Sequence, residues 1–241
     1  VVAGGVRRTA MISLSDLDDT DIRDAKKGQF FLTDPYRSVA NNSAVYETKP
    51  TNAELMDEWV ALMKSGTGER GIFNRGSLEK TMPQRRIDLL AKKYGKKGYI
   101  GQVGTNPCGE IILQSKQFCN LSEVIARAED DEKSLLRKTR LATLLGTYQS
   151  TLTKFNYISK EWTENCQQER LLGVSITGQW DCPAVRNGKT MSKMREMAIK
   201  TNKALAKRFG VPMSSSITCV KPSGTVSQTF NCSSGIHPRH S

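Results

Sequence analysis

Long segments with the periodicity of amphipathic helices alternate along this sequence with short apolar runs typical of strands. A Thr-Asn-Ala-Glu capping box at Thr51 begins one predicted helix, which runs to about Lys64 and stops at Gly66. Further helices are predicted from Asp131 to Phe155 and from Thr190 to Arg208. The predicted strands are Ala10 to Leu14, Tyr99 to Val103, Ile111 to Leu113, Leu172 to Ile176 and Ser216 to Val220. This alternation predicts an α/β protein, either an α/β barrel or a layered sheet.

Apolar residues recur at helical spacing in the first two predicted helices. In the helix that begins at Thr51 we expect them to lie in the core: Leu55, Met56, Trp59, Val60 and Met63. The helix from Asp131 carries a similar set: Leu135, Leu136, Leu141, Leu144, Leu145, Tyr148 and Leu152.

The composition of the 241 residues, 37% apolar and 25% charged, is that of an ordinary α/β protein. The chain has no signal peptide and no apolar run near the roughly 18 residues that a membrane span needs, so we expect a cytoplasmic protein without membrane contact. Six cysteines without a CxxC pair favour a reducing compartment over a disulfide scaffold or a zinc site. His237 and His240 lack further residues at ligand spacing, so we expect no metal site there.

A net charge of +12 suits polyanionic ligands, including nucleoside phosphates. The basic residues are scattered in pairs along the chain, and aromatic residues are not interleaved with them. We therefore expect solvated basic faces and no nucleic-acid surface.

Two cysteines that lie eleven residues apart carry the strongest chemical signal in the sequence. Cys108 has an amide, Asn106, two residues before it and a carboxylate, Glu110, two residues after it. Pro107 and Gly109 predict a tight turn with the sulfur at its tip, in a buried loop between two strands. A hydrogen-bond donor, an acid/base group and a thiol would then converge on one short loop.

The run Asn106-Pro107-Cys108-Gly109-Glu110, followed by Cys119-Asn120-Leu121, resembles the active-site signature of ribonucleotide reductases. Proline at position 107 resembles the adenosylcobalamin-dependent class. The alternative within the family is a large subunit of the iron-dependent class I, which more often has leucine at this position. The glycyl-radical class lacks the glutamate. Three further stretches resemble the family in the same order along the chain: 1–8, 65–73 and 221–227.

This resemblance implies part of a ten-stranded α/β barrel that binds adenosylcobalamin and reduces ribonucleotides to deoxyribonucleotides. It implies a ribonucleotide substrate, a nucleotide effector and a thioredoxin-like reductant as partners. The segment from Asp16 to Ile22 looks more like the monomeric triphosphate reductases than the dimeric diphosphate enzymes.

The resemblance also implies a role for each residue of the signature. Cys108 would become a thiyl radical that takes the 3′ hydrogen of the ribonucleotide, Glu110 would accept the 3′-hydroxyl proton, and Asn106 would bind the ribose hydroxyls. Cys119 would reduce the 2′ carbon together with a second sulfur, which the family supplies from an earlier strand.

A small-residue turn follows the strand predicted to end at Val220. A strand, a turn and a helix start expose N–H groups and hydroxyls, as phosphate-binding helix N-termini do. The turn resembles the family's cradle for substrate phosphates, which implies that role for Ser223, Gly224, Thr225, Val226 and Ser227. An ordinary capped turn is the alternative.

Two glycine-containing segments complete the set of motifs. Gly4, Gly5, Arg7 and Arg8 resemble the loop that connects base recognition to the effector site in the family. Residues 66–71 fit the pattern GxGxxG, but they follow a helix where a dinucleotide-binding fold has a strand. We therefore expect no Rossmann fold, and a helix-to-strand connection at this place.

Family members are several hundred residues long, so residues 1–241 are expected to form a single partial barrel domain of a longer chain. Leu135, Leu136, Leu141 and Leu145 would then lack partners, and we expect the isolated piece to be inactive as a reductase. One alternative is a non-catalytic module that binds nucleotide phosphates. Another is a different cysteine-nucleophile enzyme, which would need a histidine near Cys108, whereas both histidines lie in the last five residues.

Overall fold

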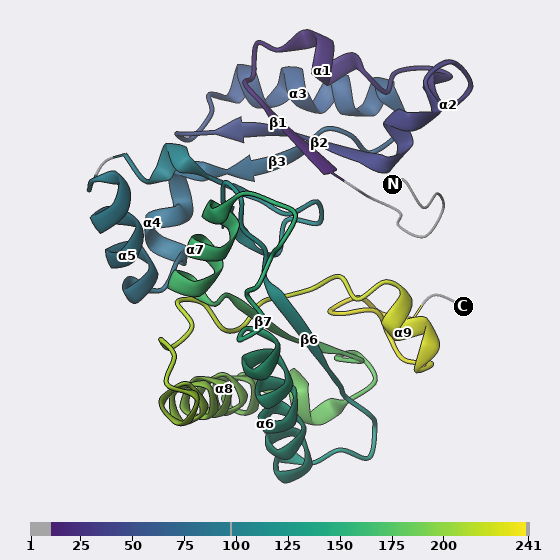
Figure 1. Cartoon of the computed structure of the whole chain (residues 1–241). Coiled ribbons are helices and arrows are strands. Elements are labelled where there is room, and N and C mark those ends of the chain that lie inside the picture. The colour runs from purple at the N-terminus through teal and green to yellow at the C-terminus, as the bar shows by residue number, and fades with distance from the viewer. Residues whose placement is uncertain (1–10, 97, 240–241) are drawn as a thin grey trace. The chain divides into compact units, whose positions relative to one another are not determined.

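The computed structural model describes residues 11–96 and 98–239, and these fold into two compact units (Figure 1). Unit 1 comprises residues 11–82 and 98–112, and unit 2 comprises residues 83–96 and 113–239. The expectation of a single partial barrel domain over residues 1–241 stays a prediction. The loop residues Gly4, Gly5, Arg7 and Arg8 lie outside the described residues.

A parallel sheet forms the centre of unit 1, with its strands in the order β1-β2-β3. Parallel neighbours need crossover connections, and helices provide them here. The strands are β1 (Met11–Ser15), β2 (Ala40–Tyr46) and β3 (Gly71–Asn74). The helices are α1 (Thr20–Asp24), α2 (Phe30–Thr33), α3 (Asn52–Ser65) and α4 (Leu78–Thr81), with 3-10 helices at Pro35–Val39, Arg75–Ser77 and Ile100–Gln102. A short strand, β4 (Val103–Thr105), leads into the signature turn.

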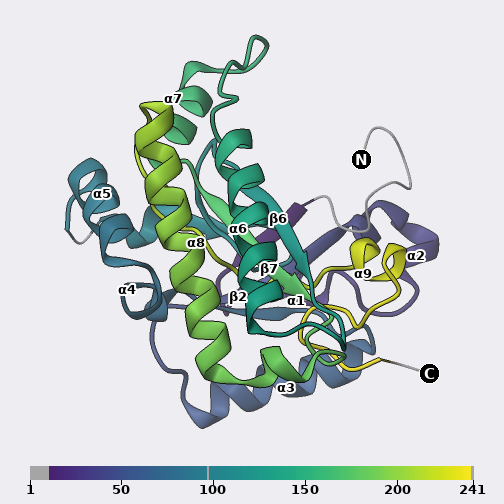
Figure 2. The same ribbon diagram turned by 90° about the horizontal axis from the view of Figure 1, so that it is seen from below.

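Unit 2 is built on the parallel pair β6 (Asn120–Ile125) and β7 (Leu172–Thr177). Figure 2 shows α6 and α8 lying beside each other along this pair. Its remaining elements are α5 (Gln84–Tyr94), α6 (Glu132–Gln149), α7 (Lys160–Glu169), a 3-10 helix at Pro183–Arg186, α8 (Gly188–Phe209) and α9 (Thr225–Thr229). Strand β5 (Ile112–Gln114) begins at the last residue of unit 1 and continues into unit 2. The core of this unit gathers apolar residues of both strands and both long helices: Val124, Leu135, Ala142, Leu172, Val174, Met194, Ala198 and Ile217.

The predicted helices are confirmed, with their ends close to the expected residues. Thr51 caps α3 through a complete capping box, and Gly66 ends the helix with a φ of 67°. The helix predicted to reach Phe155 ends at Gln149 instead. The predicted third helix is α8, which Gly210 ends in the left-handed conformation.

The prediction that the apolar stripe of α3 lies in the core is wrong. α3 contains no buried residue, and its side chains Met56, Trp59 and Met63 are more than half exposed. Helical spacing identifies residues that share a face, but only the packing decides whether another element covers that face.

Helix α6 packs against the rest of unit 2 through a face that coincides only in part with the predicted row of leucines. Leu135 is fully buried, but Leu141 and Leu145 are 51% and 63% exposed. The buried residues of the following turns are small or hydroxylated: Thr139, Ala142, Thr143, Gly146 and Thr147. Each of the three threonine hydroxyls donates to the carbonyl four residues earlier, which satisfies the buried oxygen within the helix.

Among the predicted strands, those now seen as β1, β5 and β7 are confirmed, and two are wrong. The segment predicted from Tyr99 forms a 3-10 helix, and the strand begins only at Val103. The segment from Ser216 to Val220 runs beside β7 but forms only an isolated bridge, between Thr218 and Val174. The carbonyls of residues 216 and 217 accept hydrogen bonds from the amides of residues 172 and 174 of β7. Two consecutive acceptors therefore face donors that are two residues apart, and this mismatch interrupts the regular hydrogen-bond ladder.

The mixed α/β class is confirmed. Within the described residues, the paired strands form sheets of three and two strands, and none of these sheets closes into a barrel. No helix in the described part of the chain is long and apolar enough to cross a membrane.

Candidate functional site

The signature cysteine lies at the tip of a tight turn in unit 1, as the sequence predicts. We call residues 106–111 the thiol turn. The amide of Gly109 donates to the carbonyl of Asn106 at 2.9 Å, which closes a four-residue turn with Pro107 in its second position. Gly109 adopts a φ of 81°, a conformation that glycine reaches without a steric cost. Cys108 is exposed, so the expectation of a buried loop is wrong: proline and glycine fix the turn, and its tip points to solvent.

Asn106 holds the thiol turn together with its side chain. Its Oδ1 accepts from the backbone amide of Ile111 at 3.0 Å, and its own backbone amide donates to the Ile111 carbonyl at 3.1 Å. The amide oxygen is therefore occupied within the turn. The nitrogen, Nδ2, is the side-chain atom that suits donation to a ligand oxygen.

Glu110 brings a carboxylate to the same turn. The side chain is half-buried, and its Oε2 is buried without a hydrogen-bond partner in the described structure. A buried carboxylate oxygen normally has a partner, so this atom suits a hydroxyl group of a ligand. The structure thus brings Asn106, Cys108 and Glu110 together on one turn.

Cys119 belongs to unit 2, where it directly precedes the first residue of β6. The side chain is half-buried. The next residue, Asn120, anchors the start of the strand, since both its backbone amide and its Nδ2 donate to the carbonyl of Leu171. The start of strand β6 thus determines the position of the Cys119 sulfur.

The predicted phosphate turn also lies in unit 2. We call residues 222–227 the serine turn. Ser223 and Gly224 have positive φ angles of 66° and 45°, and α9 begins at Thr225. This helix has five residues, so its N-terminal dipole is small. Ser223 is 4% exposed, and its hydroxyl is buried without a hydrogen-bond partner in the described structure.

Residues 231–239 hold the serine turn from one side. The amide of Cys232 donates to the Ser227 carbonyl at 3.0 Å, and Ser234 Oγ donates to the Pro222 carbonyl at 2.6 Å. Asp181 Oδ2 accepts from the amide of Ser233 at 2.7 Å. The hydrogen bond from Arg239 holds the pKa of Asp181 below its usual value, so this carboxylate stays charged while it anchors the segment.

Lys221 connects the serine turn to the sheet of unit 2. Its Nζ lies 3.1 Å from Glu123 Oε2 of β6, and its backbone amide donates to Ser175 Oγ of β7 at 2.9 Å. These partners lie in the second half of each strand, whereas Cys119 lies before the first residue of β6. Within unit 2, the serine turn and Cys119 are therefore held by different parts of the sheet.

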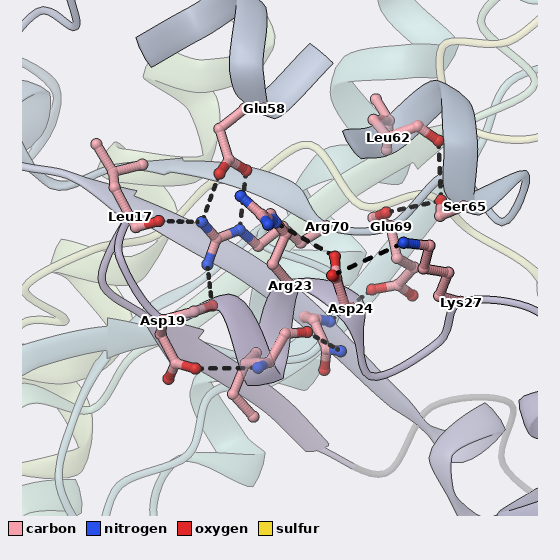
Figure 3. Close-up of polar contacts among 12 residues, drawn as sticks. Leu17, Asp19, Arg23, Asp24, Lys27, Glu58, Leu62, Ser65, Glu69 and Arg70 are labelled. Carbon is pink, nitrogen blue, oxygen red and sulfur yellow. Dashed lines mark hydrogen bonds and ion pairs between the residues drawn. The ribbon is translucent and has the colours of Figure 1, made fainter. Parts of the chain in front are cut away.

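The glycine segment 66–71 connects α3 to β3, so it joins a helix to a strand as the sequence indicates. Sequence reasoning missed the two charged residues inside it. Arg70 is 5% exposed, and Figure 3 shows its guanidinium between Glu58 and the carbonyls of Leu17 and Asp19. Glu69 Oε1 pairs with Lys26 at 2.9 Å. The spacing of the glycines in this segment does not indicate that Glu69 and Arg70 form ion pairs.

No group of three or more His, Cys, Asp or Glu side chains among residues 11–96 and 98–239 is arranged to hold a metal ion. The two turns present sulfur, carboxylate, amide and hydroxyl groups.

No protein-family profile matches the chain. The sequence is similar over almost its whole length to proteins named adenosylcobalamin-dependent ribonucleoside-triphosphate reductase. The protein of Lactobacillus leichmannii is 28% identical over 273 aligned residues, which cover 98% of this chain and 34% of the relative. The protein of Levilactobacillus brevis (strain ATCC 367) is 26% identical with the same coverage of each chain.

A solved structure gives the same result. The crystal structure of a B12-dependent (class II) ribonucleotide reductase superposes on 94% of this chain with a TM-score of 0.68 and 26% sequence identity. The chain spans about a third, 34%, of that structure and of the curated relatives. Sequence and fold agree, and the chain is a homologue of the adenosylcobalamin-dependent, class II ribonucleotide reductases.

Proposed function

We propose that this chain carries the radical cysteine and the substrate cradle of a ribonucleotide reductase, as part of a ten-stranded α/β barrel. One observation carries the proposal: the thiol turn presents an exposed Cys108, and two residues later Glu110 has a buried carboxylate oxygen without a partner among the described residues. A thiol and a carboxylate on one rigid turn suit the removal of a hydrogen atom and of a proton from the same carbon centre.

In the proposed reaction, Cys108 as a thiyl radical takes the hydrogen atom from the 3′ carbon of the ribose, forming an S–H bond. Glu110 accepts the proton of the 3′ hydroxyl through its Oε2, and Asn106 Nδ2 donates to a ribose oxygen. The 2′ hydroxyl takes a proton from the pair of thiols that includes Cys119 and leaves as water. Cys119 and a second thiol supply two electrons and end as a disulfide, which a thioredoxin-like protein reduces. After the 2′ carbon is reduced, Cys108 returns its hydrogen atom to the 3′ carbon and Glu110 returns the proton to the 3′ oxygen.

We propose adenosylcobalamin as the cofactor, the group that the relatives require by name. Cys108 is the residue that would meet it, and its exposed position at the tip of a turn fits a group that must reach the sulfur. When bound, adenosylcobalamin supplies the radical through homolysis of its cobalt–carbon bond. Pro107 and Gly109 keep the sulfur at the tip of the turn throughout.

The serine turn is the proposed cradle for the substrate phosphates. The buried hydroxyl of Ser223 has no hydrogen-bond partner in the part of the chain that the structure describes, and a phosphate oxygen would accept its hydrogen bond. The names of the relatives favour a ribonucleoside triphosphate over a diphosphate. Gly4, Gly5, Arg7 and Arg8 remain the proposed loop between base recognition and a nucleotide effector.

A reduction assay tests this function in the protein that carries the chain. Ribonucleoside triphosphates and diphosphates are offered separately with a dithiol, in one arm with adenosylcobalamin without oxygen, and in the other with ferrous iron, oxygen and a radical-generating subunit. We expect deoxyribonucleotide only with adenosylcobalamin, and faster with triphosphates. Product in the iron arm would favour the class I alternative. Nucleotide binding without reduction in any arm would favour the non-catalytic binding module.

A further inference from the structure

The thiol turn is joined to the central strand of unit 1 by a side chain that the proposed reaction does not use. Asn41 of β2 donates from Nδ2 to the carbonyl oxygen of Pro107 at 2.6 Å, across 66 residues of sequence. That carbonyl belongs to the peptide group that links Pro107 to Cys108. Because a peptide group is planar, a bond to its oxygen also fixes the direction in which the chain enters Cys108.

The alternation of side chains along β2 explains why Asn41 reaches the turn. Neighbouring residues of a strand point to opposite faces of the sheet. Asn42 donates to the carbonyl of Ile22 on the face that α1 covers, so Asn41 points to the other face. Leu14, which pairs in register with Ser43, shares that other face, and its Cδ1 lies 3.2 Å from the place of a Cβ on Gly104. β4 and the thiol turn therefore lie over this face.

The bonds inside the thiol turn fix its shape, and the bond from Asn41 fixes its place on the sheet. Within the turn, Asn106 bonds to Gly109 and Ile111. These bonds would move with the turn if it tilted as a body. A bond to β2 resists such a tilt, because the strand is paired on both sides, with β1 and with β3.

The backbone on each side of Asn41 is itself held by charged residues. Lys26 Nζ donates to the carbonyl of Ala40, and Glu69 Oε2 accepts from the backbone amide of Asn42 at 2.6 Å. Lys26 and Glu69 also form an ion pair at 2.9 Å. Figure 3 shows Glu69 beside Arg70 in the connection that leads into β3. The charged residues of segment 66–71 thus hold the strand from which Asn41 reaches the thiol turn.

We propose that Asn41 is a positioning residue for Cys108, which sets the place of the sulfur by fixing the Pro107 carbonyl on the face of β2. This inference rests on the proposed role of Cys108. Transfer of a hydrogen atom requires the two reacting atoms to be in contact, so a small displacement of the turn lowers the rate steeply. Asn41 should therefore affect the rate of the chemical step and leave substrate affinity unchanged.

The hydrogen bond is tested first in the unmodified 241-residue chain. With 15N-labelled asparagine and 13C-labelled proline, NMR detects the scalar coupling across a hydrogen bond between Asn41 Nδ2 and the Pro107 carbonyl carbon. We expect this coupling in the folded chain. Its absence, with the backbone signals of β2 intact, would overturn the proposal without any variant.

Two variants and one control test its consequence. Asn41→Asp keeps the size of the side chain but presents only acceptors to the carbonyl, and Asn41→Ala removes the group. Ser43→Ala alters the next residue on the same face of β2 and serves as the matched control. Hydrogen exchange of the Cys108 and Gly109 amides should be roughly three- to tenfold faster in both Asn41 variants, the range that the loss of one hydrogen bond predicts, and unchanged in the control.

The kinetic readout separates positioning from a general loss of structure. In the protein that carries the chain, the Asn41 variants should lower kcat by roughly tenfold or more and leave KM for the nucleotide near its original value. Equal changes in the Ser43→Ala control, or an unchanged kcat, would overturn the proposal. If Cys108→Ser still turns over, the proposed function fails, whereas the coupling and the exchange rates would still report the contact between Asn41 and the turn.

Discussion

The thiol turn and the serine turn are both short and both contain a proline and a glycine at positive φ, but they expose opposite parts of the chain. In the thiol turn, the backbone is closed by the side chain of Asn106 and the cysteine is left exposed. In the serine turn, neighbouring segments hold the backbone, and the buried hydroxyl of Ser223 has no partner within residues 11–96 and 98–239. The first turn offers a reactive side chain at its tip, and the second offers a polar lining to a ligand.

The means by which each turn is held explains this difference. A turn that is closed by its own side-chain bond needs little cover, so its tip is free to meet a large cofactor or a substrate. A turn that is packed under another segment buries its polar groups, and a buried hydroxyl left unpaired suits a bound oxygen. The comparison predicts that substitutions in the thiol turn change the chemical step, whereas those in the serine turn change substrate affinity.

The largest effect is expected for Cys108→Ser in the protein that carries the chain. Oxygen does not replace sulfur as a hydrogen-atom carrier, so turnover and the exchange of cofactor 5′ hydrogens with solvent should both fall to background. The exchange is followed with tritiated water. Nucleotide affinity should stay the same, since the serine turn is untouched. Exchange that persists in the variant would remove Cys108 from the radical role.

Cys119→Ser should stop repeated turnover with a dithiol and leave the 5′-hydrogen exchange in place. The radical step does not need this sulfur, but the two electrons for the 2′ carbon do. Product per enzyme, measured in a rapid-quench experiment, should stay below one. Cys219→Ser, which changes another half-buried cysteine of unit 2, is the control and should turn over normally. Normal turnover of Cys119→Ser would show that the redox role is wrong.

Glu110→Gln should lower kcat by roughly 10²- to 10⁴-fold, the usual contribution of a general base. The amide keeps the shape of the side chain but cannot take the 3′-hydroxyl proton. Glu129→Gln, at an exposed glutamate of unit 2, is the control for the loss of one charge. The measurement is the single-turnover rate at saturating nucleotide. A rate within a factor of about two of the original would contradict the role of Glu110 as base.

The smallest effect is expected for Gly224→Val, which tests the serine turn. Gly224 has a φ of 45° and open space where a Cβ would stand, so the change strains the backbone without a clash. Substrate binding should weaken by about 1.5–3 kcal/mol, the contribution of one hydrogen bond to a charged group, while effector binding is spared. Gly210→Val is a matched control, because Gly210 also has a positive φ, 66°, with open space around it.

Equilibrium dialysis measures the nucleotide affinity of both glycine variants. The comparison between the two turns would be weakened if Gly224→Val lowered kcat and left nucleotide affinity unchanged, or if both glycine variants lost affinity equally. In the second case, backbone strain in unit 2 would account for the loss without any phosphate contact.

Local patterns in the sequence determined the elements that depend on neighbouring residues. The capping box at Thr51, the glycine that ends α8 and the proline–glycine turn around Cys108 are all present as expected, because each needs only residues within one or two turns of chain. The resemblance to class II ribonucleotide reductases was likewise readable from short motifs, and the comparisons confirm it.

Tertiary structure alone decided which faces are covered and which polar groups meet. The leucines of α6 and the apolar stripe of α3 follow helical spacing, yet Leu141 and Leu145 of α6 are more than half exposed while its threonines are buried, and the stripe of α3 is largely exposed. Periodicity defines a face but not its neighbour. The hydrogen bonds from the Asn42 amide to Glu69 and from Asn41 to Pro107 join residues 27 and 66 positions apart. No local pattern encodes such contacts, because they form only when the strands and the turn are already in place.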